Sequence, residues 1–187
     1  FERVHGPTVV MLAKPYEPLP AERYASGVAL ALVALRRNAP QALDPALKTC
    51  NLLNNVLATR EAQSHGAFEA LMLNERGEVA EGAGSNVFVV HDGRLLTPPL
   101  EAGILAGITR EVVLELCPGL AQPVSVERLR VPDLLRADEI FVTSTLKEVV
   151  GASPLDGRPV GRGRPGPVTL RLLQAYRDFA RASCGLR

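Results

Sequence analysis

The feature that most constrains the fold is a dense run of short apolar segments in the middle of the chain, between Phe68 and Thr97. Four such segments follow one another, at 68–74, 78–81, 85–90 and 94–97. They are rich in Val, Leu and Phe, which is typical of strands. A glycine turn at Gly77 separates the first two, and the pair Asp92-Gly93 separates the last two. Because an Asp-Gly pair between apolar runs is a strong hairpin signal, the sequence predicts a hairpin-containing sheet here.

Segments with helical spacing surround this region. The apolar spacing predicts helices at 20–37, 51–66, 108–116, 132–137 and 169–182, with the run from Gly27 to Leu35 read as a buried helix. Further strands are expected at 8–13, 123–129, 139–144 and 149–152, and loops at 14–20 and 38–48. This order predicts a mixed α/β fold.

Composition narrows the class of protein. The chain has 187 residues, about the size of one domain, and a net charge of +1. Without a basic excess or any Trp, nucleic acid is not expected as a partner, and no apolar run reaches the ~18 residues of a membrane span. Three cysteines far apart suit a reducing, cytoplasmic location. Because the chain opens at Phe1 rather than Met, we expect further residues before it.

Several common functional motifs are absent. The three histidines lack the spacing of metal ligands, so no metal site is expected. The glycine-rich stretch 161–166 lacks the Lys-Ser/Thr of a P-loop and reads as a plain turn. Gly82 and Gly84 resemble the start of a dinucleotide fingerprint, but Val87 stands where the third glycine belongs.

Two turns are candidate anion sites. Gly107-Ile108-Thr109 opens a predicted helix, where free N–H groups and a hydroxyl can bind an anion. Thr143-Ser144-Thr145 ends a predicted strand with three hydroxyls. Taken alone, the first is most simply an ordinary helix start. Lys48, one of only three lysines, precedes the helix at 51–66, and taken alone it reads as a solvated lysine.

Taken together, the motifs are similar to those of the class IV aminotransferases, which are pyridoxal 5′-phosphate (PLP) enzymes of fold type IV. The resemblance runs in family order from about Thr8 to Ala180. It is carried by the segments at 48–62, 66–71, 77–88, 97–100, 103–110, 137–145 and 156–161, with the Gly-Pro pair at 166–167.

The resemblance implies roles for individual residues. Lys48 corresponds to the lysine that holds PLP as a Schiff base and moves the proton, and Glu81 to the carboxylate that faces the pyridine nitrogen. Leu105 corresponds to a residue packed on the ring face. Arg110 follows the phosphate turn, and we expect a structural role for it. Glu61 resembles a family position within the helix at 51–66, and the sequence supports no specific role for it.

The same resemblance places the cofactor's phosphate. Gly107, Ile108 and Thr109 correspond to one side of the phosphate site. Ser144, Thr145 and Leu146 correspond to a second turn, with Ser144 and Thr145 binding the phosphate, and Thr145 and Leu146 the carboxylate of the substrate.

For the whole protein, the resemblance implies the larger, C-terminal domain of fold type IV, a mixed sheet partly forming a barrel with flanking helices. Residues 1–19 are then a strand and linker from an N-terminal domain largely absent from this chain, and 20–187 are the PLP-binding domain. A homodimer is expected from the family.

The implied reaction is amino-group transfer between an amino acid and a 2-oxo acid. A 4-amino-4-deoxychorismate lyase, which releases 4-aminobenzoate and pyruvate from aminodeoxychorismate, and a non-catalytic protein of the same fold remain alternatives. Leu52 stands where branched-chain members often carry a Tyr, a departure shared with D-amino-acid transaminase-like members.

Overall fold

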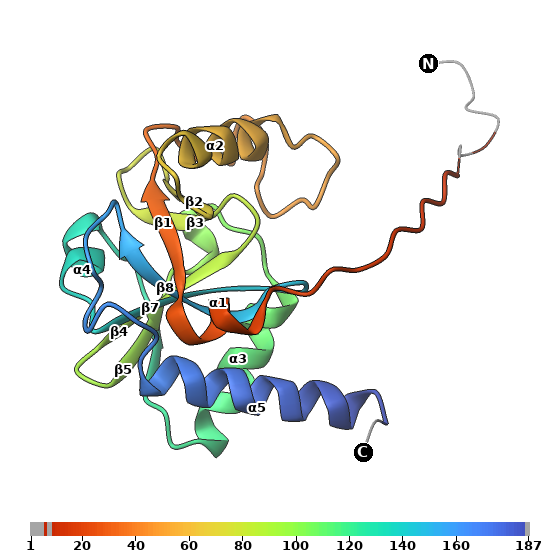
Figure 1. The fold of residues 1–187 in the computed structure, drawn as a ribbon. Coiled ribbons are helices and arrows are strands. Elements are labelled where there is room, and N and C mark those ends of the chain that lie inside the picture. Colours follow the sequence, from red (N-terminus) through yellow and green to blue (C-terminus); the bar gives the residue numbers. More distant parts are fainter. Residues whose placement is uncertain (1–5, 7–8, 186–187) are drawn as a thin grey trace.

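One eight-stranded mixed sheet organises the molecule, a computed structural model that describes residue 6 and residues 9–185. The strand order is β3-β2-β1-β8-β7-β4-β5-β6. The sheet is curled into a half-open barrel (Figure 1). β1 pairs in parallel with both β2 and β8, and β5 pairs in parallel with β6. The remaining neighbours are antiparallel, including the hairpins β2–β3, β4–β5 and β7–β8.

The strands are short and closely spaced along the chain. Their bounds are β1 Val28–Leu32, β2 Glu69–Leu73, β3 Val79–Gly82, β4 Asn86–His91, β5 Arg94–Thr97, β6 Val124–Val126, β7 Glu139–Ser144 and β8 Glu148–Leu155. The predicted hairpin turn is present, with Asp92 at φ 47° and Gly93 at φ 74°, the left-handed conformations that such a tight turn requires. The four strands predicted between 68 and 97 are therefore confirmed.

Five α-helices and a short 3₁₀ turn accompany the strands within the described residues. Their bounds are α1 Ala21–Ser26, α2 Leu53–Ser64, the 3₁₀ turn η1 Leu100–Ala102, α3 Ile108–Gly119, α4 Val131–Leu135 and α5 Pro167–Ser183. In Figure 1, α2 covers the β1–β2 end of the sheet, whereas α3 and α5 lie together beside β7 and β8.

The two largest buried side-chain clusters lie on opposite faces of the sheet. Alternate residues of β4 and β7, such as Val87 and Val142, fill the inside of the curled sheet. Their neighbours Phe88 and Phe141 stack with ring centroids 4.8 Å apart and pack against α3 and α5. This alternation follows from the two-residue period of a strand. It buries both faces and fixes the strand ends on which the site residues lie.

The helix predicted over 20–37 is wrong. Only Ala21–Ser26 is helical, and the helix ends at Gly27, whose φ of 86° is not a helical value. The following run becomes β1, a central strand with neighbours on both sides. A continuous apolar run buried on both faces does not reveal its period, so spacing alone could not separate this strand from a helix.

The strand predicted at 8–13 is also wrong over the residues that the structure describes. Thr8 lies outside them, and residues 9–20 have no regular secondary structure. Val9 to Leu12 are 70–91% exposed and pair with no strand of the described sheet. A β-branched sequence forms a strand only where a partner edge is available.

The other predicted elements are confirmed, with boundaries shifted by a few residues. The predicted helix at 51–66 is α2, followed by Gly66 at φ 71°, and the predicted helix at 108–116 is α3, entered through Gly107. The stretch 161–166 is a turn. The predicted mixed, partly barrel-forming sheet with flanking helices is confirmed.

Candidate active site

A single cavity of about 830 Å³ gathers segments that are far apart in the sequence. Its walls come from the loop before α2, one face of α2, the β3–β4 connection, the segment leading into α3, and the end of β7. Eight of the nine predicted site residues line it: Lys48, Glu81, Leu105, Gly107, Ile108, Thr109, Ser144 and Thr145. The ninth, Leu146, is not part of the lining and is 64% exposed.

Lys48 lies in the long loop between β1 and α2, and its side chain is exposed at the cavity. The start of this loop is fixed by Glu61 of α2. The Glu61 carboxylate accepts the N–H of Ala34 at 2.6 Å and that of Leu35 at 3.4 Å. Glu61, for which the sequence alone supports no role, therefore ties α2 to the segment that follows β1.

Glu81 is the most enclosed charged group of the cavity wall. Its side chain is 5% exposed, and every contact to it comes from a different segment. Oε1 accepts the Arg37 Nε–H at 2.8 Å, while Oε2 accepts the Leu105 N–H at 3.0 Å and an Asn86 amide N–H at 3.3 Å. Each carboxylate oxygen has two lone pairs, so the carboxylate can still accept a further donor from the cavity.

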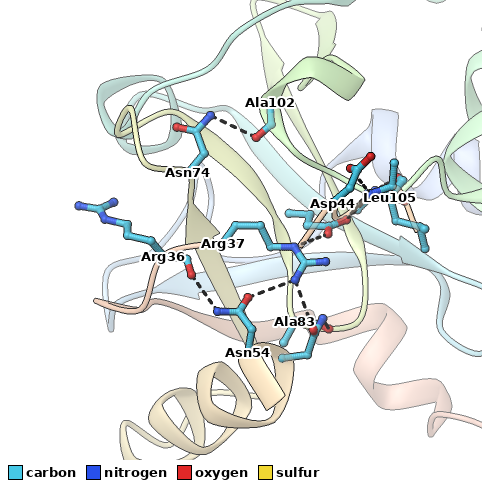
Figure 2. Close-up of polar contacts among 12 residues, drawn as sticks. Arg36, Arg37, Asp44, Asn54, Asn74, Ala83, Ala102 and Leu105 are labelled. Carbon is cyan, nitrogen blue, oxygen red and sulfur yellow. Dashed lines mark hydrogen bonds and ion pairs between the residues drawn. The ribbon is translucent and has the colours of Figure 1, made fainter. Parts of the chain in front are cut away.

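Arg37 was not identified from the sequence, although it makes the closest contact with Glu81. Its guanidinium also donates to the side-chain oxygens of Asn54 at 3.1 Å and Asn55 at 3.3 Å, at the start of α2. Figure 2 shows Arg37 between Asn54 and the segment of Leu105. An arginine next to a second arginine before a loop carries no sequence signal of burial, which explains why it was missed.

Burial raises the pKa of Glu81 to about 7, and the Arg37 guanidinium and the Leu105 N–H oppose that rise. The carboxyl is therefore balanced between its neutral and ionised forms near neutral pH. A cationic donor in the cavity would shift that balance toward the carboxylate, because an opposite charge favours the ionised form.

The start of α3 is a candidate anion site. The first N–H groups of a helix have no partner within the helix, and those of Ile108 and Thr109 donate to no main-chain acceptor among the described residues. Gly107 is required for this geometry. A Cβ added there would lie 1.9 Å from Asn86 Oδ1, the amide that also contacts Glu81.

The turn after β7 presents a second set of donors. Ser144 and Thr145 line the cavity, and the N–H groups of Thr145 and Leu146 donate to no main-chain acceptor in the described part of the chain. Thr143 also lines the cavity, and its buried hydroxyl has no hydrogen-bond partner there. Both predicted anion turns therefore border the same cavity as Lys48 and Glu81.

These donors fit PLP. The two turns offer N–H and O–H groups for a phosphate, and the lysine is an amine for an aldehyde. The buried glutamate is an acceptor for a protonated ring nitrogen. Among the described residues, no group of three or more His, Cys, Asp or Glu side chains could hold a metal ion.

Arg110 follows the predicted phosphate turn but is absent from the cavity lining. It is 7% exposed and donates to the Pro98 carbonyl at 2.9 Å, while its Nε has no partner in the described structure. This contact ties α3 to the segment after β5, in agreement with the structural role expected for it.

Comparison with known proteins agrees with this geometry. The family model described as amino-transferase class IV matches residues 3–154. The chain belongs to the class IV aminotransferases. The match begins before α1 and ends within β8, so it includes every segment that lines the cavity.

Individual relatives are similar over nearly the whole chain. A relative from Methanocaldococcus jannaschii is 39% identical over 173 residues, which are 92% of this chain and 59% of the relative. The branched-chain-amino-acid aminotransferase of Escherichia coli K12 is 38% identical over 170 residues, 90% of this chain and 55% of its own. The chain thus spans a little over half the length of these relatives.

A solved structure has the same fold. The T.th. branched-chain amino acid aminotransferase, with pyridoxamine 5′-phosphate, superposes with a TM-score of 0.82 at 38% identity, covering 84% of this chain and 53% of that one. The same enzyme has been solved with N-(5′-phosphopyridoxyl)-L-glutamate and with 4-methylvaleric acid.

Within the described residues, no helix combines the length and apolar composition needed to cross a membrane.

Proposed function

We propose that this chain is the PLP-binding part of an aminotransferase that moves an amino group between an amino acid and a 2-oxo acid. The observation that carries the proposal is the cavity itself. One lysine, one buried glutamate and two sets of unpaired donors, predicted from separate motifs, all border it.

In this proposal Lys48 performs the covalent and proton-transfer steps. Bound PLP supplies an electron sink for the charge left on the substrate Cα when its proton departs. Lys48 Nζ would hold the cofactor in the resting protein, and as a free amine it would take the Cα proton of the substrate. Its exposed place on a loop that lines the cavity allows the side chain to move between these two positions.

Glu81 and Arg37 set the charge around the ring nitrogen. The ionised Glu81 carboxylate accepts a hydrogen bond from the protonated nitrogen and keeps that proton in place. Arg37 holds Oε1 at 2.8 Å and favours the ionised form, while the Leu105 N–H and Asn86 fix Oε2. These contacts orient the carboxylate before the cofactor enters.

We assign the phosphate of the cofactor to both turns and the carboxylate of the substrate to the second turn. The N–H groups of Ile108 and Thr109, with the Thr109 hydroxyl, bind phosphate at the start of α3. The Ser144–Thr145 turn at the end of β7 adds further donors for the phosphate. Thr145 and Leu146 also bind the carboxylate of the substrate. We place Leu105 against the face of the ring, next to its own contact with Glu81.

We further propose branched-chain amino acids as the substrate class. The E. coli and T.th. enzymes described above carry that name, and the second has been solved with 4-methylvaleric acid, a branched apolar acid. Leu52 departs from the Tyr frequent in branched-chain members, so this chain lacks one hydroxyl near the ring. The homodimer, the cytoplasmic location and the domain division at residues 19–20 stay predictions.

A PLP lyase acting on 4-amino-4-deoxychorismate is the second candidate, because it would use the same lysine and cofactor contacts. The two activities separate in an assay of the full-length protein with two substrate sets. One set pairs L-leucine, D-alanine or L-glutamate with 2-oxoglutarate or pyruvate. The other supplies aminodeoxychorismate and follows 4-aminobenzoate.

The proposal expects amino transfer from L-leucine to 2-oxoglutarate. Release of 4-aminobenzoate and pyruvate without transfer to any 2-oxo acid would replace it with the lyase. A protein that binds no PLP and supports neither reaction would be a non-catalytic member of the fold.

A further inference from the structure

Lys147 follows the second anion turn directly and joins it to a distant strand. Its Nζ forms an ion pair with Glu69, at the start of β2, and lies 5.3 Å from the centroid of the Phe68 ring. In the sheet, β7 and β2 are separated by β8 and β1, so this contact spans two strands. The Glu69 side chain is only 4% exposed, whereas that of Lys147 is 26% exposed.

Glu69 also makes a hydrogen bond to the β3–β4 connection, the part of the cavity wall that follows Glu81 in the chain. Its Oε2 accepts the Ser85 hydroxyl at 3.1 Å, and its Oε1 accepts the Ala70 N–H at 3.2 Å. Ser85 lines the cavity. One buried carboxylate therefore links the β3–β4 connection to the turn between β7 and β8.

The peptide that joins Leu146 to Lys147 is fixed at both ends. The Leu146 carbonyl accepts the Tyr16 hydroxyl at 2.7 Å, and the Lys147 N–H donates to Ser144 Oγ at 3.2 Å. Because Ser144 Oγ accepts this bond, its own proton remains available to donate into the cavity. The N–H groups of Thr145 and Leu146, as noted above, have no main-chain acceptor in the described structure.

We propose that Lys147 and Glu69 are positioning residues for the anion that the Ser144–Leu146 turn binds. Neither touches the reacting atoms; their ion pair holds the turn so that its N–H and O–H donors face the cavity. A buried carboxylate that loses its cation must rearrange, and here the β7–β8 turn would also lose its link to the β3–β4 connection. The inference rests on the proposed function, because the anion is a phosphate or carboxylate group of its cofactor or substrate.

Positioning and simple attraction by the Lys147 charge predict different results for one variant. Glu69→Gln removes a negative charge close to the anion turn. If only charge mattered, anions would bind more tightly to this variant. If the pair positions the turn, anions bind less tightly although the local charge has become more favourable.

The test compares Lys147→Met, Lys147→Arg and Glu69→Gln with a matched control, Arg128→Met. Arg128 is a half-exposed cation paired at 2.6 Å with Glu78, a carboxylate 6% exposed that lies outside the cavity lining. Dissociation constants are measured for PLP and for pyridoxal, which lacks the phosphate. In the holoenzyme, kcat and KM are measured for the 2-oxo acid, which reports on the carboxylate.

We expect Lys147→Met and Glu69→Gln to weaken PLP binding, or to raise KM for the 2-oxo acid, by about tenfold, the size of one lost hydrogen bond. Pyridoxal affinity and kcat should stay within about twofold of wild type, because neither depends on the anion turn. A twofold change is smaller than the effect of losing one hydrogen bond. Lys147→Arg keeps the cation and should retain the wild-type PLP affinity and KM. Arg128→Met should also leave both constants unchanged.

Three results would overturn the inference. They are anion binding in both variants equal to the Arg128→Met control, tighter binding in Glu69→Gln, or an equal loss for PLP and pyridoxal. In each case a wild-type protein that binds PLP and transfers amino groups leaves the proposed function standing. A wild type that does neither overturns both.

Discussion

Removal of the Arg37 guanidinium tests how the charge of Glu81 is controlled. Arg37→Met deletes the Nε–H that lies 2.8 Å from Glu81 Oε1, in a pair whose side chains are 8% and 5% exposed. Breaking a buried pair of this kind costs about 3–5 kcal/mol of stability. We expect a loss of that size in urea unfolding of the protein without cofactor at alkaline pH, where the wild-type carboxylate is ionised, and a smaller loss at acidic pH, where it is protonated.

The variant should also move the pKa of Glu81 upward, because Arg37 lowers it and burial alone raises it. Binding of a protonated pyridine ring needs the ionised carboxylate, so affinity weakens as the pH falls through the pKa of Glu81, which is about 7 in the wild type. In Arg37→Met this midpoint should lie at higher pH.

The assay uses pyridoxine 5′-phosphate, which has no aldehyde, so the bond to Lys48 does not contribute to its affinity. Dissociation constants are measured from pH 5.5 to 9 for wild type, Arg37→Met and Arg37→Lys, a range chosen around the pKa of about 7. Arg37→Lys keeps the charge and should shift the midpoint less. An unchanged or lowered midpoint in Arg37→Met would refute the role given to Arg37.

Three further substitutions test other parts of the site. Glu81→Gln should lower kcat by about 100-fold, as loss of an active-site electrostatic contact often does, and near-normal turnover would remove Glu81 from the mechanism. Since burial raises the pKa of Glu81 from 4.5 to about 7, the carboxyl costs wild-type stability as the pH rises through that window. Without cofactor, Glu81→Gln should lack this loss of about 3 kcal/mol in the free energy of unfolding. The same dependence of unfolding free energy on pH in wild type and variant would contradict this expectation. Thr109→Val should weaken PLP binding by about 5–10-fold through loss of one hydroxyl donor, with pyridoxal binding unaffected; an equal effect on both ligands would place Thr109 away from the phosphate. Gly107→Ala should destabilise the protein and weaken PLP binding, because its Cβ would lie 1.9 Å from Asn86 Oδ1, and a wild-type melting temperature would show that this contact relaxes freely.

Local signals in the sequence predicted much of the fold because they coincide with the tertiary structure. The Asp92-Gly93 turn and the glycine at the end of α2 act within a few residues of their own position. The error at 20–37 arose where burial on both sides removes any periodic signal. The error at 8–13 arose where strand formation depends on a partner edge.

The site divides in the same way. Lys48, Glu81 and the two anion turns lie in motifs whose order along the chain resembles the family, and all of them border the cavity. Arg37 and the Lys147–Glu69 pair were not predicted. Their importance comes from contacts across 44 and 78 positions of sequence, which only the folded sheet brings together.

The identity of the cofactor lysine tests the central claim most directly. Lys14, Lys48 and Lys147 are the only lysines of the chain, so reduction of the PLP-loaded protein with borohydride has three possible targets besides the amino terminus. Peptide mass mapping should find a pyridoxyl group on Lys48, and Lys48→Ala should lose both the label and the PLP absorbance. A pyridoxyl group on Lys14 or Lys147, with Lys48 unmodified, would contradict the account of this site.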